Sequence, residues 1–132
     1  NNERRGRMAN ILIVDDQANV RTAVMQLLLS CNRTDLNVDQ TTNGTEALRR
    51  LQSKKYDLLI SDTDMPGMNG ADLMRAVRGD EKLKELPAIL MLAVGAGKQD
   101  VLNAVALGIS GFIIKPFRPE QLRAQIKKVM GW

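Results

Sequence analysis

The sequence predicts an α/β protein in which helices cover both faces of a doubly wound, five-stranded parallel sheet. Three observations support this prediction. Short apolar runs alternate with helical patterns five times along the chain. The central runs are continuously apolar, as in strands that are buried on both faces. The length of 132 residues suits one domain. Strands joined through helices imply right-handed crossovers between parallel neighbours.

Five segments are expected to form the strands. Four are short, continuous and apolar, which fits strands covered on both faces. These four are residues 11–14, 58–60, 88–92 and 112–114. The fifth, residues 37–41, has a weaker period of two and suits the edge of the sheet.

Five helices are expected, and each places apolar residues on one face. The face residues are Val20, Val24, Leu27 and Leu28; Ala47, Leu48 and Leu51; Leu73, Met74 and Val77; Val101, Leu102 and Val105; Leu122, Ile126 and Val129. Residues typical of helix ends accompany these patterns. Asn43-Gly44 and Gly70 precede the second and third helices, Gly108 follows the fourth, and Pro119 lies near the start of the last.

The composition is that of an ordinary globular domain. Apolar residues make up 44% and charged residues 26%, and no apolar run approaches the roughly 18 residues that a membrane span needs. Histidine is absent, which excludes Ser-His-Asp and Cys-His catalysis and most zinc sites. The single Cys31 cannot form an internal disulfide and fits a reducing, cytoplasmic compartment.

Residues 1–9 show no periodicity and are expected to be a flexible extension or a remnant of cloning, so that the folded domain spans residues 10–132. The formal net charge is +4, but Arg4, Arg5 and Arg7 supply much of it. The remaining chain is nearly balanced in charge and its four aromatic residues are scattered. Both features argue against binding of nucleic acid.

Charged residues follow three of the predicted strands. Asp15 and Asp16 follow the first, Asp62 and Asp64 belong to the end of the third, and Lys115 follows the fifth. In open α/β sheets, ligands bind at the carboxyl ends of the strands where the strand order reverses. With the order 2-1-3-4-5, the first and third strands are neighbours at this point, so Asp15, Asp16 and Asp62 come together. The side chain of Lys115 spans much of the distance that remains.

Three carboxylates in one place repel one another, at about 4 kcal/mol for each pair about 4 Å apart at an effective dielectric near 20. Lys115 and a bound cation are the available counter-charges. Since the ligands are all oxygen atoms, a hard ion such as Mg²⁺ is expected. A metal ion, a lysine and an exposed carboxylate together predict phosphoryl transfer to the carboxylate.

These residues resemble the bacterial response-regulator receiver domain, especially its single-domain chemotaxis kind. The resemblance covers residues 10–130 and is carried by residues 11–16 (ILIVDD), 61–70 (SDTDMPGMNG) and 108–117 (GISGFIIKPF). It implies the flavodoxin-like strand order 2-1-3-4-5 and a phosphoryl group received from a phosphohistidine. The donor is then a sensor histidine kinase or a histidine phosphotransfer protein, and the output is a surface change that another protein detects.

The resemblance also implies the role of each site residue. Asp62 corresponds to the phosphoacceptor. The implied Mg²⁺ ligands are Asp15, largely through water, Asp16, Asp62 and the backbone carbonyl of Asp64. The groups expected to contact the phosphoryl group are Lys115, Thr63 and the backbone N–H of Val94. The bond between Lys115 and Pro116 is expected to be cis.

Two positions differ from the receiver pattern. Receivers usually carry Thr or Ser directly after the fourth strand, where this chain has Ala93, and the partner aromatic residue is Phe112, which lacks a hydroxyl group. We therefore expect phosphorylation to shift the surface less than usual. Alternatively, Phe112 leans over Ala93 in every state and the output depends only weakly on phosphate.

Two alternative functions remain open at this point. Ala93 favours a pseudo-receiver that binds its partner independently of phosphate. The Asp62-Thr63-Asp64 motif also resembles the nucleophile motif of haloacid-dehalogenase-type phosphohydrolases, but there it normally follows the first strand. The expectation is therefore a phosphoacceptor rather than an enzyme. Stoichiometric phosphorylation that needs Mg²⁺ supports a receiver, whereas sustained release of phosphate supports a hydrolase.

Overall fold

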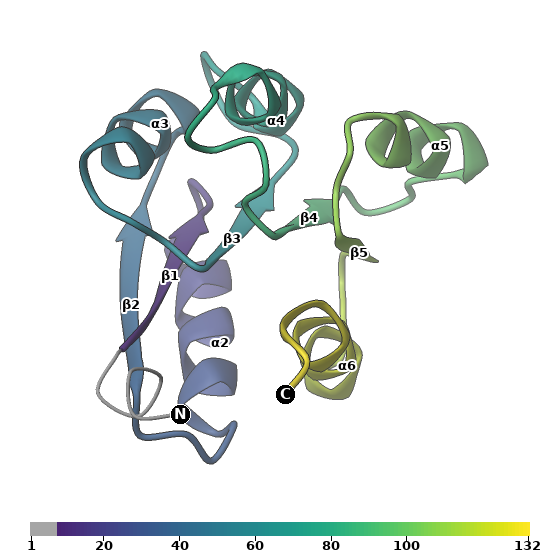
Figure 1. Ribbon diagram of the computed structural model, residues 1–132. Coiled ribbons are helices and arrows are strands. Elements are labelled where there is room, and N and C mark those ends of the chain that lie inside the picture. The colour runs from purple at the N-terminus through teal and green to yellow at the C-terminus, as the bar shows by residue number, and fades with distance from the viewer. Residues whose placement is uncertain (1–7) are drawn as a thin grey trace.

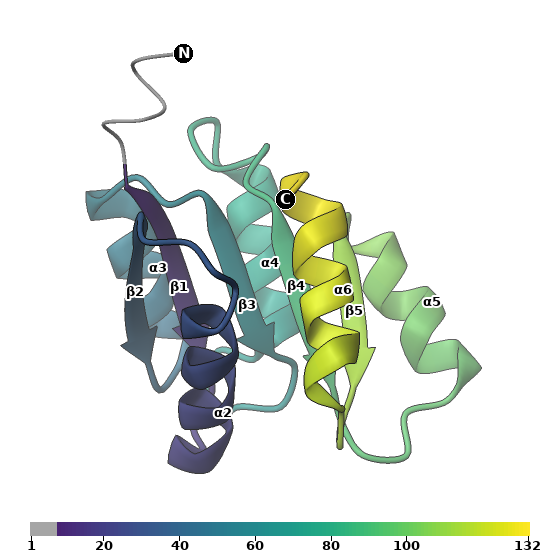
Figure 2. The same cartoon turned by 90° about the horizontal axis from the view of Figure 1, so that it is seen from below.

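The computed structural model, which describes residues 8–132, contains one sheet of five parallel strands in the order β2-β1-β3-β4-β5 (Figure 1). The strands are β1 (Ala9–Val14), β2 (Leu36–Thr41), β3 (Leu58–Asp62), β4 (Ala88–Leu92) and β5 (Gly111–Ile114). All strand arrows point the same way in Figure 2, which agrees with the parallel pairing of each neighbouring pair. The predicted fold class, the strand order and the edge position of β2 are confirmed.

A helix follows each strand. The helices are α2 (Ala18–Leu29), α3 (Gly44–Ser53), α4 (Gly70–Gly79), α5 (Lys98–Ala106) and α6 (Pro119–Met130). Their ends have clear local causes. The Asn43 side chain accepts a hydrogen bond from the Glu46 backbone N–H and begins α3. Asn69 and Asp72 form a capping box that begins α4. Gly108, just beyond α5, has a φ of 79°, which suits glycine.

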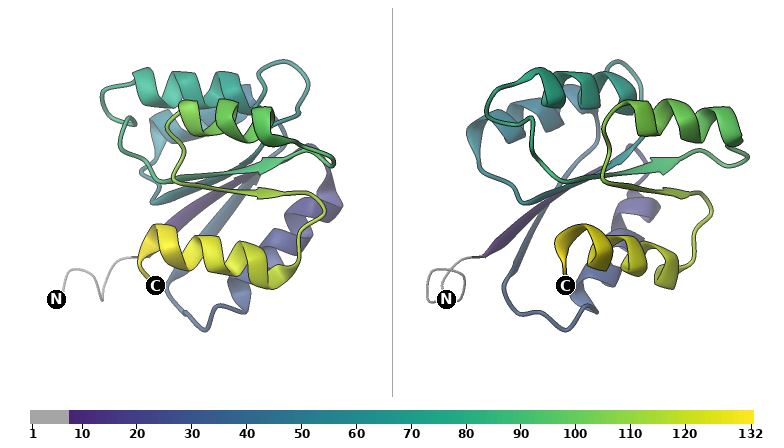
Figure 3. Two further views of the ribbon diagram at one scale, coloured as in Figure 1. Left: turned by 90° about the vertical axis from the view of Figure 1, so that its right-hand side faces the viewer. Right: turned by 45° about the vertical axis from the view of Figure 1, so that its right-hand side comes forward.

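The sheet lies between two helical layers, with α3, α4 and α5 on one face and α2 and α6 on the other (Figure 3). Successive side chains of a strand point to opposite faces. In β1, Leu12 and Val14 therefore pack with the first layer, while Ile11 and Ile13 pack with the second. All four are fully buried, which explains the continuous apolar run in the sequence.

The buried face predicted for α5 is wrong in two of its three residues. Leu102 and Val105 are 51% and 54% exposed, whereas Ala104 is the buried residue of the helix and Val101 is half-buried. α5 packs mainly against β4, near the edge of the sheet. We attribute the exposure to this position, because little sheet surface is left there to cover a second row of apolar side chains.

The first strand begins slightly earlier than expected. Ala9, which the lack of periodicity places in the extension, is the first residue of β1, and its N–H donates to the Asp35 carbonyl at 2.7 Å. Residues 1–7 of the expected extension lie outside the described residues. Within residues 8–132, no helix is both long enough and apolar enough to cross a bilayer.

Candidate functional site

Three carboxylates meet at the carboxyl ends of β1 and β3. These strands are neighbours in which Val14 pairs with Ser61, so the next residues, Asp15 and Asp62, lie level with each other. One carboxylate oxygen from each of Asp15, Asp16 and Asp62 lies within 4.8 Å of the others. Asp15 is fully buried and Asp62 is 4% exposed, while Asp16 is exposed. The sheet therefore brings together the acidic side chains that the sequence singled out.

Lys115 enters this cluster from the end of β5. Its Nζ atom donates to Asp15 Oδ2 at 2.9 Å and lies 3.2 Å from Asp62 Oδ1. The Lys115–Pro116 bond is cis, as expected. The one ammonium group of Lys115 thus forms ion pairs with two buried carboxylates that come from different strands.

The cluster remains short of positive charge. Burial, followed by the charge of Asp15, raises the pKa of Asp62 despite the opposing effect of Lys115. Burial alone would lower the pKa of Lys115, but the hydrogen bond to Asp15 and the charges of both carboxylates outweigh burial and raise it. Lys115 is therefore held firmly as a cation, yet it does not offset the cost of ionising Asp62.

This donor set fits a hard divalent cation. The cluster offers carboxylate oxygens with no histidine or cysteine, which is the ligand chemistry of Mg²⁺. Both oxygens of Asp15 already accept hydrogen bonds, from the Gln17 N–H at 2.8 Å and from Lys115. Asp16 and Asp62 would therefore be the more direct carboxylate ligands, with Asp15 acting through water.

The other residues implied by the resemblance lie on β5 and in the loops that follow β3 and β4. The Thr63 hydroxyl donates to the Met91 carbonyl at 3.2 Å, and Asp64 is exposed in the loop before α4. Val94 is 72% exposed, whereas Ala93 is half-buried. A hollow of about 720 Å³ between α4 and α5 is lined by both residues and by Thr63 and Asp64, so open space borders Ala93. Phe112 is half-buried against the core cluster on the α3–α4–α5 side of the sheet.

Two residues at the site were not predicted to act there. A Cβ atom added to Gly70 would lie 2.4 Å from the Asp62 carbonyl oxygen, so α4 packs directly on the backbone of Asp62. Arg21 of α2 donates to the Asp15 carbonyl at 2.7 Å. The sequence placed Gly70 at the start of a helix, where it is the first residue of α4, but it gave no sign that this residue packs on Asp62. No residue type in the sequence indicates a side chain that donates to a main-chain oxygen.

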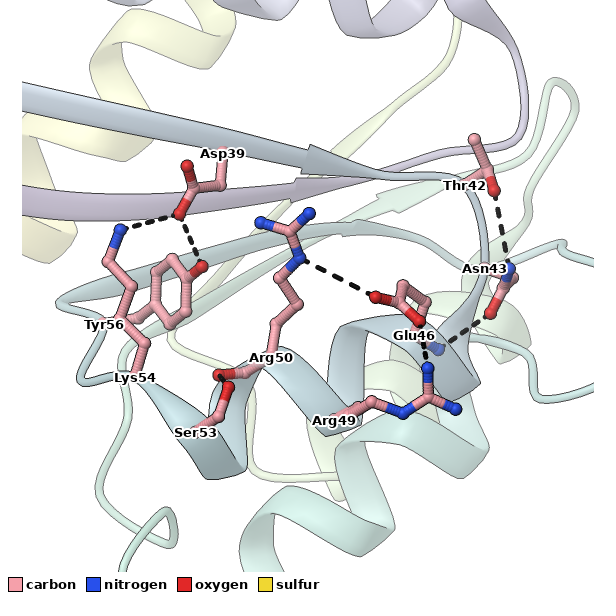
Figure 4. Close-up of polar contacts among 9 residues, drawn as sticks. All are labelled: Asp39, Thr42, Asn43, Glu46, Arg49, Arg50, Ser53, Lys54 and Tyr56. Atoms are coloured by element: carbon pink, nitrogen blue, oxygen red, sulfur yellow. Dashed lines mark hydrogen bonds and ion pairs between the residues drawn. The ribbon is translucent and has the colours of Figure 1, made fainter.

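A second polar cluster links β2 to the segment that follows α3 (Figure 4). Asp39 Oδ2 accepts hydrogen bonds from the Tyr56 hydroxyl at 2.6 Å and from Lys54 Nζ at 2.8 Å. Burial, together with the hydrogen bond and charge of Asp39, raises the pKa of Tyr56 to about 12. These contacts tie the edge strand to the core and involve none of the site residues predicted from the sequence.

Comparison with known proteins agrees with this geometry. Residues 11–127 match the family described as "Response regulator receiver domain". The chemotaxis protein CheY of Pseudomonas aeruginosa is 41% identical over 119 residues, which cover 90% of this chain and 94% of that protein. CheY1 of Helicobacter pylori is 35% identical over 122 residues, which cover 92% of this chain and 96% of that protein.

The fold agrees as well. The structure of the chemotaxis response regulator CheY4 of Vibrio cholerae superposes with a TM-score of 0.81 at 31% identity, covering 92% of this chain and 98% of that one. The strand order, the acidic cluster at the ends of β1 and β3 and these similarities agree with one another. They also exclude the phosphohydrolase alternative. The chain belongs to the response regulator receiver family, as a CheY-like member and not as an enzyme in the usual sense.

Proposed function

We propose that the protein accepts a phosphoryl group on Asp62 from a phosphohistidine and signals the modification to another protein through its surface. The observation that carries the proposal is the convergence of Asp15, Asp16 and Asp62 around one lysine. Crowded carboxylates destabilise a fold unless a ligand supplies charge. A divalent cation would bind the carboxylates, and Lys115 would contact a phosphoryl group transferred to Asp62.

The positions of these groups support the proposed transfer. A carboxylate oxygen of Asp62 attacks phosphorus, the bond between phosphorus and the donor imidazole nitrogen breaks, and an acyl phosphate forms. Lys115 lies 3.2 Å from Asp62 Oδ1 and can move onto a phosphoryl oxygen while it stays beside Asp15. A bound Mg²⁺ would help to neutralise the phosphoryl oxygens.

The donor histidine lies outside the 132 residues of this sequence, because these contain no histidine. A sensor histidine kinase or a histidine phosphotransfer protein supplies the required chemistry. The proposed Mg²⁺ ligands are Asp16, Asp62, the backbone carbonyl of Asp64 and, through water, Asp15. We propose that Thr63 and the Val94 N–H contact the phosphoryl group. The cytoplasmic location expected from Cys31 is part of the same proposal.

Mass spectrometry of the intact protein after treatment with acetyl phosphate tests the proposal. We expect one phosphoryl group per chain with Mg²⁺, and none after chelation or in Asp62→Asn. Asp72→Asn is a matched control, because its carboxylate is exposed on α4 and an amide oxygen can still accept the capping hydrogen bond. An unmodified wild-type protein would contradict the proposal.

A second candidate function is the phosphate-independent pseudo-receiver, which the methyl side chain of Ala93 favours. It predicts that a binding partner captures wild type and Asp62→Asn equally well, whether or not acetyl phosphate is present.

A further inference from the structure

Every polar group of the buried Asp15 has a partner. Its N–H donates to the Thr41 carbonyl at 3.2 Å, and its carboxylate accepts from the Gln17 N–H and from Lys115. Its carbonyl oxygen accepts from Arg21 Nη1 at 2.7 Å. The first contact continues the pairing of the strands and the next two hold the carboxylate. The contact from Arg21 differs, because a helix side chain holds a main-chain oxygen within the acidic cluster.

Arg21 is itself held in place. Its Nε atom donates to Gln40 Oε1 of β2 at 3.1 Å, and the residue is half-buried. A guanidinium group is planar and its donors are fixed relative to one another. The contact to Gln40 therefore sets the direction from which Nη1 approaches the Asp15 carbonyl.

The Asp15 carbonyl belongs to the peptide that joins Asp15 to Asp16. Because a peptide group is planar, fixing its oxygen fixes the orientation of the whole group and so the position of the Asp16 Cα atom, from which the side chain starts. Asp16 is exposed, so little packing holds it beside Asp62. Repulsion from the two buried carboxylates would otherwise favour a rotation of Asp16 away from them.

We infer that Arg21 is a positioning residue for the divalent-cation site: it holds the Asp15–Asp16 peptide so that Asp16 faces Asp62. The inference rests on the proposed function, because it concerns the cation that this function uses. The two possible effects of Arg21 have opposite signs. By its charge alone, a guanidinium group beside the site weakens the binding of a cation, whereas by its geometry it strengthens binding.

Titration with Mn²⁺, followed by the electron paramagnetic resonance signal of the free ion, measures binding without any phosphorylation. We expect Arg21→Met to raise the dissociation constant about tenfold, as is typical when a group that orients a metal ligand is lost. Arg21→Lys keeps the charge but has a single donor nitrogen, so it can contact the Asp15 carbonyl or Gln40 and should recover part of this loss. Arg49→Met is the control, because Arg49 is an exposed arginine of α3 that pairs with Glu46.

The outcomes separate the inference from the function on which it rests. Binding by Arg21→Met that equals or exceeds wild-type binding would overturn the inference, because charge removal alone predicts tighter binding. If that variant does not fold, Gln40→Leu decides. It removes only the second contact of Arg21, so we expect weaker binding than in wild type, and unchanged binding would again overturn the inference. A wild-type protein that binds no Mn²⁺ would instead refute the cation site itself.

Discussion

Lys115 donates a hydrogen bond to Asp15 across 2.9 Å, although one hundred residues separate them in the chain. Asp15 follows β1 and Lys115 follows β5, with β3 and β4 between the two strands. The contact depends on the whole central sheet, and the same ammonium group reaches Asp62. The fold therefore allows the ammonium group of Lys115 to contact carboxylates that follow two different strands, and the proposed chemistry depends on this arrangement.

Asp62→Asn should stabilise the metal-free protein at neutral pH. The pKa of Asp62 is raised in the folded state, so the folded protein holds this proton more tightly than the unfolded chain. The resulting stability is lost as the pH rises from the ordinary value of 3.8 through the raised folded value. At pH 7 we expect Asp62→Asn to be more stable than wild type by ~1 kcal/mol, with the difference shrinking below pH 3.8. Urea unfolding across this pH range measures it.

Added Mg²⁺ provides the control for this comparison. A ligand that binds only the folded state stabilises it, so Mg²⁺ should raise the unfolding midpoint of wild type more than that of Asp62→Asn. A metal-free wild type more stable than Asp62→Asn at pH 7 would show that Lys115 alone compensates the buried charge.

Gly70→Ala should disturb the site, whereas Gly79→Ala should not. The new Cβ at position 70 would approach the Asp62 carbonyl oxygen to 2.4 Å and the Thr63 Cα to 2.8 Å, but nothing lies within 4 Å of one at position 79. Backbone must move to relieve the first contact, at a cost of about 1–3 kcal/mol. Thermal unfolding and acetyl phosphate labelling of both variants measure the effect. Equal behaviour of the two would contradict the close packing of α4 on Asp62.

Tyr56 should ionise near pH 12 rather than near its ordinary value of 10. It is the single tyrosine of the chain, so the absorbance of tyrosinate reports on this residue alone. Stability from the raised pKa is present below pH 10 and is lost as the pH rises towards about 12. Asp39→Asn should lower the midpoint, because it removes the charge that accepts the Tyr56 hydroxyl. A midpoint near 10 in folded wild type would contradict the burial of Tyr56 together with its hydrogen bond to Asp39.

Tyr56→Phe tests the same contact through stability. We expect a loss of about 1–2 kcal/mol at pH 7, as for a hydrogen bond to a charged group. The difference from wild type should shrink above pH 10, where the tyrosine begins to lose its proton in the unfolded chain. A stability difference between wild type and Tyr56→Phe that stays constant up to pH 12 would show that folding does not raise the pKa of Tyr56.

The strands and the acidic cluster could be predicted from the sequence for the same reason. Strands buried on both faces read as continuous apolar runs, and parallel strands bring their following residues to one edge, so Asp15 and Asp62 were expected to meet. The exposure of Leu102 and Val105 was not predictable in this way. Periodicity identifies an apolar helix face but does not show how much of the sheet remains to cover it.

The contacts made by main-chain atoms could not be predicted from the sequence either. The Arg21 contact ends on a carbonyl oxygen, which every residue possesses, so no residue type in the sequence marks it. The close approach of Gly70 to Asp62 is similar, because a glycine at the start of a helix has several common explanations. Three-dimensional packing was needed to distinguish them.

Ala93→Thr should strengthen the response of the surface to phosphorylation. The hollow that borders Ala93 leaves room for a larger side chain, and a hydroxyl group there could donate to a phosphoryl oxygen on Asp62. We expect larger phosphorylation-dependent amide shifts in α5 and in the loop before it than in wild type. Ala96→Thr, in the same loop, is the control. A full shift already present in phosphorylated wild type would show that Ala93 does not weaken the coupling.

Borohydride reduction of the phosphorylated protein tests the central claim most directly. The reagent reduces an acyl phosphate to an alcohol and so converts a phosphorylated aspartate to homoserine, which peptide mass spectrometry locates. After treatment with acetyl phosphate and Mg²⁺, we predict homoserine at position 62 alone, and none when Mg²⁺ is chelated. Homoserine at position 15 or 16, or at no aspartate, would contradict the role of Asp62 as the phosphoacceptor.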